Sequence, residues 1–384
     1  MDNKLFTIKN INYINLKNIK IIYNDISNIN IYSCEKHYNK LYTSKNLINN
    51  NIKKWDYYKK ITNMYEYVNT SPYKYLYISK EKHLSRSFYK LIEILKKCDI
   101  LNYLKFIPIN CFHLAEGPGG FIEAICYLRN NKKDKYIGMT LINNDKKTPN
   151  WNSAKQFLDN NKNVFIEYGA DKTGDLYNPN NFDYCYKKYK NNMNFITADG
   201  GFDFSINFKN QEINAYRLIL TQVFYALIMQ KKNGIFILKI YESFIKSTID
   251  IIYFLSCFYK KVQILKPHTS RTANSEKYIV CIGFNNEIKV YNIFLKILKE
   301  LGNIDFNKKY IEQILNIDYN LYFKNIISKI NTHFVKNQIN NIDNTLDYIN
   351  TDKNINYLKK INIKYSMSWF KIFNIPYNNI KITN

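Results

Sequence analysis

The sequence has few of the residues that hold metals or disulfides. Seven cysteines and five histidines occur among 384 residues, and no two cysteines form a C-x-x-C pair. A structural zinc site is therefore not expected, and we expect no metal in the functional site. An odd number of scattered cysteines instead indicates reduced thiols in a cytosol-like compartment.

Long apolar runs are also missing. The best one, residues 218–229, is interrupted by Thr221 and Gln222 and is too short to span a bilayer. The N-terminal segment MDNKLFTIKNINY lacks the apolar centre of a secretory signal. We therefore expect no membrane partner and a cytoplasmic location, which includes a viral cytoplasmic compartment, with the nucleus as the alternative.

Acidic residues are the scarcer charged type. The chain has 31 Asp+Glu against 56 Lys+Arg, a net charge of +25. Such a surplus favours a polyanionic partner, most simply nucleic acid. The alternative is a solubilising surface in a chain rich in residues with AT-rich codons. That codon bias also weakens the 35 tyrosines as evidence for base stacking.

What the chain does have, from residue 85 onward, is an alternation of strand and helix patterns. Residues 85–98 predict an amphipathic helix, and residues 211–230 predict a long crossover helix that ends before Asn233-Gly234. This alternation predicts a doubly wound α/β sheet that binds ligands at the carboxyl ends of its strands. Seven runs predict its strands, most of them apolar on both faces: Cys111–Ala115, Tyr136–Leu141, Val164–Tyr168, Asn194–Ala198, Gly234–Tyr241, Val262–Leu265 and Tyr278–Phe284.

The two ends of the chain have weaker patterns. Residues 1–70 show no strong period and are interpreted as a mixed or partly ordered region. Residues 287–301 predict an amphipathic helix that Gly302 ends, and residues 303–384 predict further helices joined by polar segments. We therefore divide the chain into a basic N-terminal region (1–84), an α/β domain (85–284) and a mainly helical C-terminal extension (285–384).

The stretch 111–124, CFHLAEGPGGFIEA, organises the α/β part. It predicts a strand, an acidic residue (Glu116), a glycine-rich turn and a helix that opens at Phe121. Glycine lets the backbone turn with positive φ and approach a ligand closely, and a helix start presents free N–H groups. A plain turn would explain Gly-Pro-Gly-Gly equally well.

Polar residues follow further strands of the predicted sheet. Asp199 ends one strand in ADGGFD, Lys239 lies at the end of the next, and Glu276 precedes the last. Glu276 joins the same edge of the sheet only if that last strand is antiparallel. Each residue alone would more often be structural, as a turn acid, a snorkelling lysine or a strand-flanking acid. Their succession at strand ends favours a functional site.

With Lys90 in the helix before them, these residues follow the order Lys-Asp-Lys-Glu. Together with AEGPGGF, ADGGFD, GIFILKIY and KPHTSRTANSEKYIVCIGF, the chain resembles the FtsJ-like ribose 2′-O-methyltransferases. The resemblance covers residues 85–284. It implies a Rossmann-like sheet of seven strands, the last antiparallel, with N- and C-terminal extensions. It also implies S-adenosylmethionine as cofactor and Lys90, Asp199, Lys239 and Glu276 as catalytic residues.

Making a ribose hydroxyl attack a methyl group calls for a lysine of depressed pKa, or one that stabilises the forming alkoxide. Lys239 is the candidate for that role. The acid that usually holds the cofactor ribose is absent, because Met139-Thr140-Leu141 stands there. The same absence argues against a nicotinamide oxidoreductase. The expected cofactor contacts are Glu116, Gly117, Pro118, Gly119, Gly120, Phe121, Thr140, Asp171, Asp175 and Asp199, where a loop-capping role is equally open for Asp171 and Asp175.

ADGGF and the loop containing Trp151 resemble the cap-specific branch of this family, which includes viral members. The expected substrate is therefore the first transcribed nucleotides of capped mRNA, and other capping or transcription proteins are possible partners. Trp151 and N-terminal tyrosines are candidates for stacking on a cap guanine, although simple packing explains Trp151 better. The alternatives are a ribosomal or transfer RNA methyltransferase and a catalytically silent RNA-binding subunit on the same scaffold.

Overall fold

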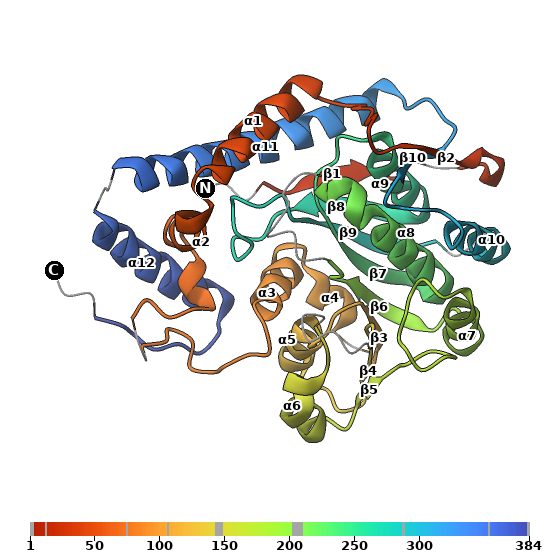
Figure 1. Cartoon of the computed structure of the whole chain (residues 1–384). Coiled ribbons are helices and arrows are strands. Elements are labelled where there is room, and N and C mark those ends of the chain that lie inside the picture. Colours follow the sequence, from red (N-terminus) through yellow and green to blue (C-terminus); the bar gives the residue numbers. More distant parts are fainter. Residues whose placement is uncertain are drawn as a thin grey trace.

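The structure is a computed structural model that describes residues 4–11, 14–73, 76–105, 107–142, 149–201, 210–285, 289–351 and 354–381. Its centre is an eight-stranded sheet in the order β1-β8-β9-β7-β6-β3-β4-β5 (Figure 1). The strands are β1 (Phe6–Lys9), β3 (Asn110–Leu114), β4 (Lys135–Met139), β5 (Val164–Ile166), β6 (Met193–Ala198), β7 (Gln230–Ile240), β8 (Tyr259–Leu265) and β9 (Lys277–Phe284).

The strand directions place the expected site. β5, β4, β3, β6 and β7 are mutually parallel, whereas β9 runs antiparallel to both β7 and β8. Ile240, the last residue of β7, therefore lies opposite Lys277, the first residue of β9. The condition for bringing Glu276 to the carboxyl ends of the other strands is thus met, and the predicted mostly parallel α/β sheet is confirmed.

Helices cover both faces of the sheet because its strands are apolar on both sides. Phe195 of β6 packs with one buried cluster and its neighbour Ile196 with the other. The first cluster lies beneath α3 (Ser87–Lys97), α4 (Ile100–Leu104), α5 (Gly120–Arg129) and α6 (Lys155–Asn160). The second lies beneath α7 (Pro179–Tyr189), α8 (Gln211–Met229), α9 (Lys246–Phe258) and α10 (Tyr291–Leu301).

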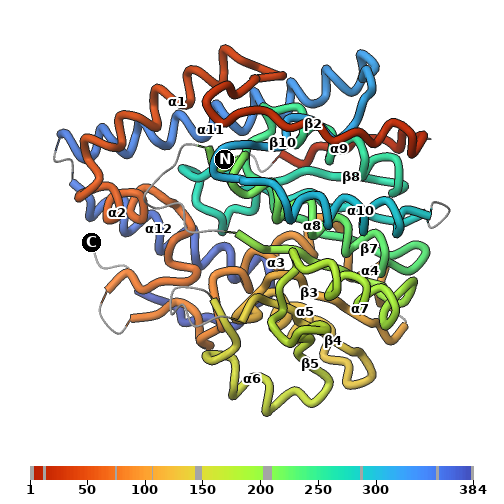
Figure 2. Tube along the Cα trace, turned by 45° about the vertical axis from the view of Figure 1, so that its right-hand side comes forward, coloured from red at the N-terminus to blue at the C-terminus, as the bar shows by residue number. Residues whose placement is uncertain are grey.

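The N- and C-terminal extensions pack against one another. Figures 1 and 2 show α1 running alongside α11. Leu41 and Trp55 share a third buried cluster with Val335 and Ile342, and that cluster includes Phe244 from the segment after β7. The helices of this layer are α1 (Glu35–Asn49), α2 (Ile52–Ile61), α11 (Leu321–Thr351) and α12 (Ile355–Phe373).

The structure adds strands at both chain ends that the sequence did not predict. The N-terminal region is ordered through most of its described length, and its β1 adds an eighth strand to the sheet, antiparallel to β8. The C-terminal part is mainly helical, and its β10 (Lys309–Leu315) pairs with β2 (Ile19–Asp25) in a second, two-stranded sheet. Both pairings join segments more than 200 residues apart, which no local pattern reveals. No helix in the described ranges is long and apolar enough to cross a membrane.

Candidate active site at the carboxyl ends of the central strands

The four residues of the Lys-Asp-Lys-Glu order, called the tetrad below, meet at the carboxyl ends of β6 and β7. Lys90 Nζ lies 2.7 Å from Glu276 Oε1, and Lys239 Nζ lies 3.2 Å from Asp199 Oδ1. Lys239 also donates a 2.6 Å hydrogen bond to the backbone oxygen of Asp199. All four side chains are at most 11% exposed. The competing lysines of α3 bond elsewhere, Lys96 to the backbone of Phe373 and Lys97 to Glu93.

Two hydroxyl groups that the sequence did not single out complete this cluster. Ser87 Oγ donates to Asp199 Oδ2 at 2.7 Å, and Tyr278 OH donates to Asp199 Oδ1 at 2.8 Å. Tyr278 OH also lies 3.3 Å from Glu276 Oε1, so it bridges the two acids. The β7–β9 register places Tyr278 opposite Lys239. A prediction that β7 and β9 pair would have placed Tyr278 beside Lys239. The contact of Ser87 with Asp199 becomes visible only once the position of α3 is known.

The charges of the tetrad reinforce one another. Burial by itself would lower the pKa of Lys239, but Asp199, Tyr241 and Glu276 together raise it above its ordinary value. Burial opposes ionisation of Glu276, yet Lys90, Lys239 and Lys266 hold its pKa well below its usual range. Of the two chemical roles open to Lys239, this electrostatic environment favours a charged ammonium that stabilises negative charge.

The segment that carries Glu276 is held by buried acids of other elements. Glu93 of α3 accepts hydrogen bonds from the backbone N–H groups of His268 and Thr269, at 2.7 and 3.2 Å. Glu66, between α2 and α3, pairs with Arg86 and Arg271, each at 2.8 Å. The KPHTSRTANSE segment is therefore fixed over most of its length, which explains why so polar a loop can place a buried carboxylate.

The glycine-rich turn packs tightly against protein. A Cβ at Gly120 would lie 2.2 Å from Ser85 Oγ, and one at Gly119 would lie 3.2 Å from the Trp151 ring. Gly119 also has φ +103° at the start of α5, so glycine is required there for conformation as well. The side chain of Phe121 lies in the core, 1% exposed. These glycines thus bring α3 and α5 together, and a contact with cofactor stays a prediction.

Glu116 is buried beside this turn in a polar cluster that the sequence did not predict. It accepts a hydrogen bond from Thr197 Oγ1, which itself lies 2.7 Å from His113 Nδ1. Burial raises the pKa of Glu116, although His113 opposes the shift. The second oxygen, Oε2, is buried without a hydrogen bond and lies 3.4 Å from His113 Nδ1.

Thr140 and the loop after β5 lie next to the glycine-rich turn. A Cβ at Gly117 would lie 3.1 Å from Thr140 Cγ2, and one at Gly174 would lie 2.0 Å from the Thr140 carbonyl. Asp171 accepts bonds from Thr173 and from two asparagines, and Asp175 accepts one from the backbone of Tyr177. Of the two roles left open for these acids, the structure shows loop capping.

Two features suggested the cap-specific branch, Trp151 and the ADGGF motif, and the structure describes the first of them fully and the second in part. Trp151 packs on Gly119 and Gly138 under the glycine-rich turn, which supports the packing role. The end of the ADGGFD motif, from Phe202 on, lies outside the described residues. No group of His, Cys, Asp and Glu in the described ranges is arranged to hold a metal.

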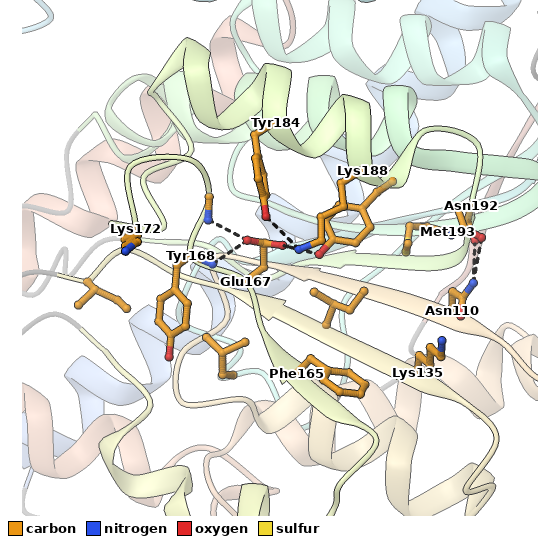
Figure 3. A pocket seen from close by; sticks show the side chains of 15 residues that line it. Asn110, Lys135, Phe165, Glu167, Tyr168, Lys172, Tyr184, Lys188, Asn192 and Met193 are labelled. Carbon is orange, nitrogen blue, oxygen red and sulfur yellow. Dashed lines mark hydrogen bonds and ion pairs between the residues drawn. The ribbon is translucent and has the colours of Figure 1, made fainter.

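A large cavity lies elsewhere, on the sheet face beside β5. It has a volume of about 1060 Å³, and none of the tetrad lines it. Figure 3 shows Phe165 and Tyr168 among its lining residues, together with Glu167, which is bonded to Lys188. The cavity is thus a separate feature of the molecule.

Residues 83–284 match the model of the FtsJ-like methyltransferases, and the chain belongs to this family. Similar curated proteins are the cap-specific mRNA (nucleoside-2′-O-)-methyltransferases 1 of mouse, Trypanosoma brucei brucei and human. They are 29%, 30% and 32% identical over 62%, 52% and 50% of this chain. These matches span 29%, 55% and 24% of the respective relatives, so the chain covers about a quarter to about half of their lengths.

Among solved structures, a Plasmodium falciparum protein described as a ribosomal RNA methyltransferase is similar over 53% of this chain and 98% of its own. Its sequence identity is 22% and its TM-score 0.37.

Proposed function

We propose that this protein is an S-adenosylmethionine-dependent ribose 2′-O-methyltransferase that acts on the first transcribed nucleotides of capped mRNA. The observation that carries the proposal is the buried tetrad, in which two lysines and two acids meet at the carboxyl ends of β6, β7 and the start of β9. Family membership and the cap-specific names of its relatives support the choice of substrate.

The residues around the glycine-rich turn suit the cofactor. Glu116 Oε2 is a buried oxygen without a hydrogen bond, the kind of acceptor that a ligand's ammonium group satisfies. Thr140 adjoins Gly117, and the loop from Asp171 to Asp175 adjoins Thr140 through Gly174. These residues would contact the adenosine part, while Asp199 would border the reacting end. When bound, S-adenosylmethionine supplies a methyl group on a positively charged sulfur.

In this mechanism Lys239 binds the ribose hydroxyl. Its ammonium group, kept charged by Asp199 and Glu276, stabilises negative charge that develops on the hydroxyl oxygen. The hydroxyl proton leaves to solvent as the oxygen takes the methyl group and the bond between methyl and sulfur breaks. Lys90 and Glu276 form the second ion pair of the tetrad. Ser87 and Tyr278 fix the orientation of Asp199 by their hydrogen bonds. Orienting the hydroxyl in line with the methyl group supplies much of the rate.

The test is methyl transfer from radiolabelled cofactor to three RNAs. One carries a 7-methylguanosine cap without ribose methylation, one is uncapped, and one already bears a 2′-O-methyl group on its first nucleotide. Label on the first RNA alone is expected. Label on the first and third would move the target beyond the first nucleotide, and equal label on all three would make the protein an internal-site RNA enzyme.

A catalytically silent RNA-binding subunit is the second candidate, favoured only by the net charge of +25. Tight RNA binding without transfer to any of the three RNAs would establish it. In either case RNA affinity should fall with salt, with a slope of about −0.7 per phosphate neutralised on single strands.

A further inference from the structure

A second buried charged cluster lies next to the tetrad, where both extensions meet the sheet. Lys45 of α1, Glu242 after β7 and Ser275 before β9 are all at most 7% exposed. Lys45 Nζ lies 2.5 Å from Glu242 Oε1, and the same oxygen accepts a hydrogen bond from Ser275 Oγ. We call these three residues the Lys45 cluster.

The Lys45 cluster joins the two segments that carry half of the tetrad. Glu242 follows Lys239 along the chain, and Ser275 directly precedes Glu276. The β7–β9 ladder ends at Ile240 and Lys277, so backbone pairing does not reach either cluster residue. The side chains of the Lys45 cluster therefore continue the connection beyond the ladder, at the place where the spacing of Lys239 and Glu276 is set.

The C-terminal extension supports the same two segments. Gln338 of α11 donates to the Ala273 carbonyl at 3.0 Å and to Ser275 Oγ at 3.2 Å. Asn331 of α11 donates to the Ser243 carbonyl at 2.7 Å and accepts from Ser243 Oγ at 2.5 Å. Both extensions thus hold the segments that follow β7 and precede β9.

The positive charge of Lys45 compensates the buried negative charge of Glu242. Glu242 is buried, and Lys45 is the foremost of the groups that offset this burial and lower the pKa of Glu242, with Ser275 and Lys277 as the others. Glu242 also acts electrostatically on Glu212 of α8, a second buried acid, whose pKa is raised first by burial and then by Glu242. Removing Lys45 would leave the buried Glu242 with only Lys277 to offset its charge and that of Glu212, and Glu242 would reorient or take up a proton.

From this arrangement we infer that Lys45 is a positioning residue for the reaction, which through Glu242 and Ser275 fixes Lys239 and Glu276 at the separation that catalysis needs. The inference rests on the proposed methyl transfer. It assigns the N-terminal extension an effect on rate rather than on affinity.

The test compares Lys45→Met with Lys40→Met, which removes the same charge from an exposed position of the same helix. Single-turnover methyl transfer to capped RNA should fall on the order of 100-fold in Lys45→Met, as expected for a displacement of about 1 Å. Cofactor stoichiometry by calorimetry and the KM for RNA should stay within about two-fold of the wild type, because neither binding surface changes. Lys40→Met should match the wild type.

The double variant Lys45→Met/Glu242→Gln keeps the test decisive if the single variant does not fold. It removes both charges together, and the amide oxygen of the new glutamine can still accept from Ser275. We therefore expect a folded protein with a rate about 10-fold below the wild type.

A folded double variant with the wild-type rate would overturn the inference. It would also be overturned if Lys45→Met lost its rate only in proportion to a loss of cofactor-binding sites in the calorimetric titration. Absence of transfer by the wild type would instead refute the proposed function and this inference with it.

Discussion

The two halves of the sheet differ in what covers them. At the β7–β9 half, Lys239 and Glu276 are buried beneath the segments that α1 and α11 hold in place. At the β4–β5 half, Phe165 and Tyr168 are 48% and 44% exposed beside an open cavity. Both halves contain an acid bonded to a lysine, Glu276 with Lys90 and Glu167 with Lys188. The two pairs differ in their lysines, since Lys90 is 11% exposed and Lys188 is 48% exposed. The comparison teaches that an ion pair is shielded from solvent only where both of its partners are buried.

The sharpest way to break the comparison is to remove one carboxylate charge from each half. Asp199→Asn keeps the shape of the side chain but removes the charge that faces Lys239 and that accepts from Ser87 and Tyr278. We expect methyl transfer to fall by about 100- to 1000-fold, the usual effect of losing one transition-state contact. The assay is kcat on capped RNA.

Glu167→Gln is the matched control in the open half, and its transfer rate should stay within about two-fold of the wild type because it lies away from the tetrad. Equal losses in the two variants would mean that the β4–β5 half shares in the chemistry.

Glu66→Gln tests whether the covered half depends on buried charge for its stability. Burial opposes ionisation of Glu66, but Arg86 and Arg271 outweigh it and lower its pKa from 4.5 to about 2. A lowered pKa contributes stability that is present above about pH 4.5 and is lost as pH falls toward 2. At pH 7 the variant should lose about 3 kcal/mol of unfolding free energy, because two arginines are left without their partner.

Urea unfolding at pH 7 and at pH 3 measures this effect. The difference in stability between wild type and variant should shrink at the lower pH. A difference of the same size at both pH values would show that the ionised form of Glu66 is not what matters.

Gly201→Ala makes a smaller change beside the tetrad. The new Cβ would lie 3.0 Å from Lys239 Nζ and 2.5 Å from Tyr241 OH, so both side chains must shift by a few tenths of an ångström. We expect kcat to fall about 10-fold while cofactor affinity is unchanged. A variant that binds cofactor weakly but turns over normally would place Gly201 in the cofactor site instead.

The smallest effect is expected for Phe165→Ser, in the open half. The side chain is 48% exposed, so the unfolding free energy should change by no more than about 1 kcal/mol. The transfer rate should equal that of the wild type. A large loss of activity would reveal that something must cover the cavity beside β5 during the reaction.

Much of the sheet could be predicted from the sequence, because buried parallel strands are apolar runs with polar residues at their carboxyl ends. Asp199 and Lys239 followed from that rule alone. Glu276 also required the antiparallel direction of β9, which the family resemblance supplied. Lys90 was ambiguous among the lysines of α3, and only the packing of that helix shows which of them reaches Glu276.

The rest depends on contacts between distant segments. Ser87 starts a predicted helix and Lys45 lies in a stretch without a distinctive pattern, but the partners of both lie more than 100 residues away. The glycines of the turn were expected to make room for a ligand, which stays a prediction, and the structure shows that Gly119 and Gly120 also make room for Trp151 and for α3. A glycine-rich turn in the sequence indicates that another group lies close to the backbone, and the structure shows which group that is.

The most direct test of the account is Lys239→Ala, measured by single-turnover methyl transfer to capped RNA and by calorimetric titration with S-adenosylmethionine. Since Lys239 is proposed to act on the ribose hydroxyl and not on the cofactor, transfer should fall by about 1000-fold or more while cofactor affinity changes by less than about three-fold. A loss of affinity as large as the loss of rate, or transfer that persists, would contradict the assignment of Lys239 as the centre of the active site.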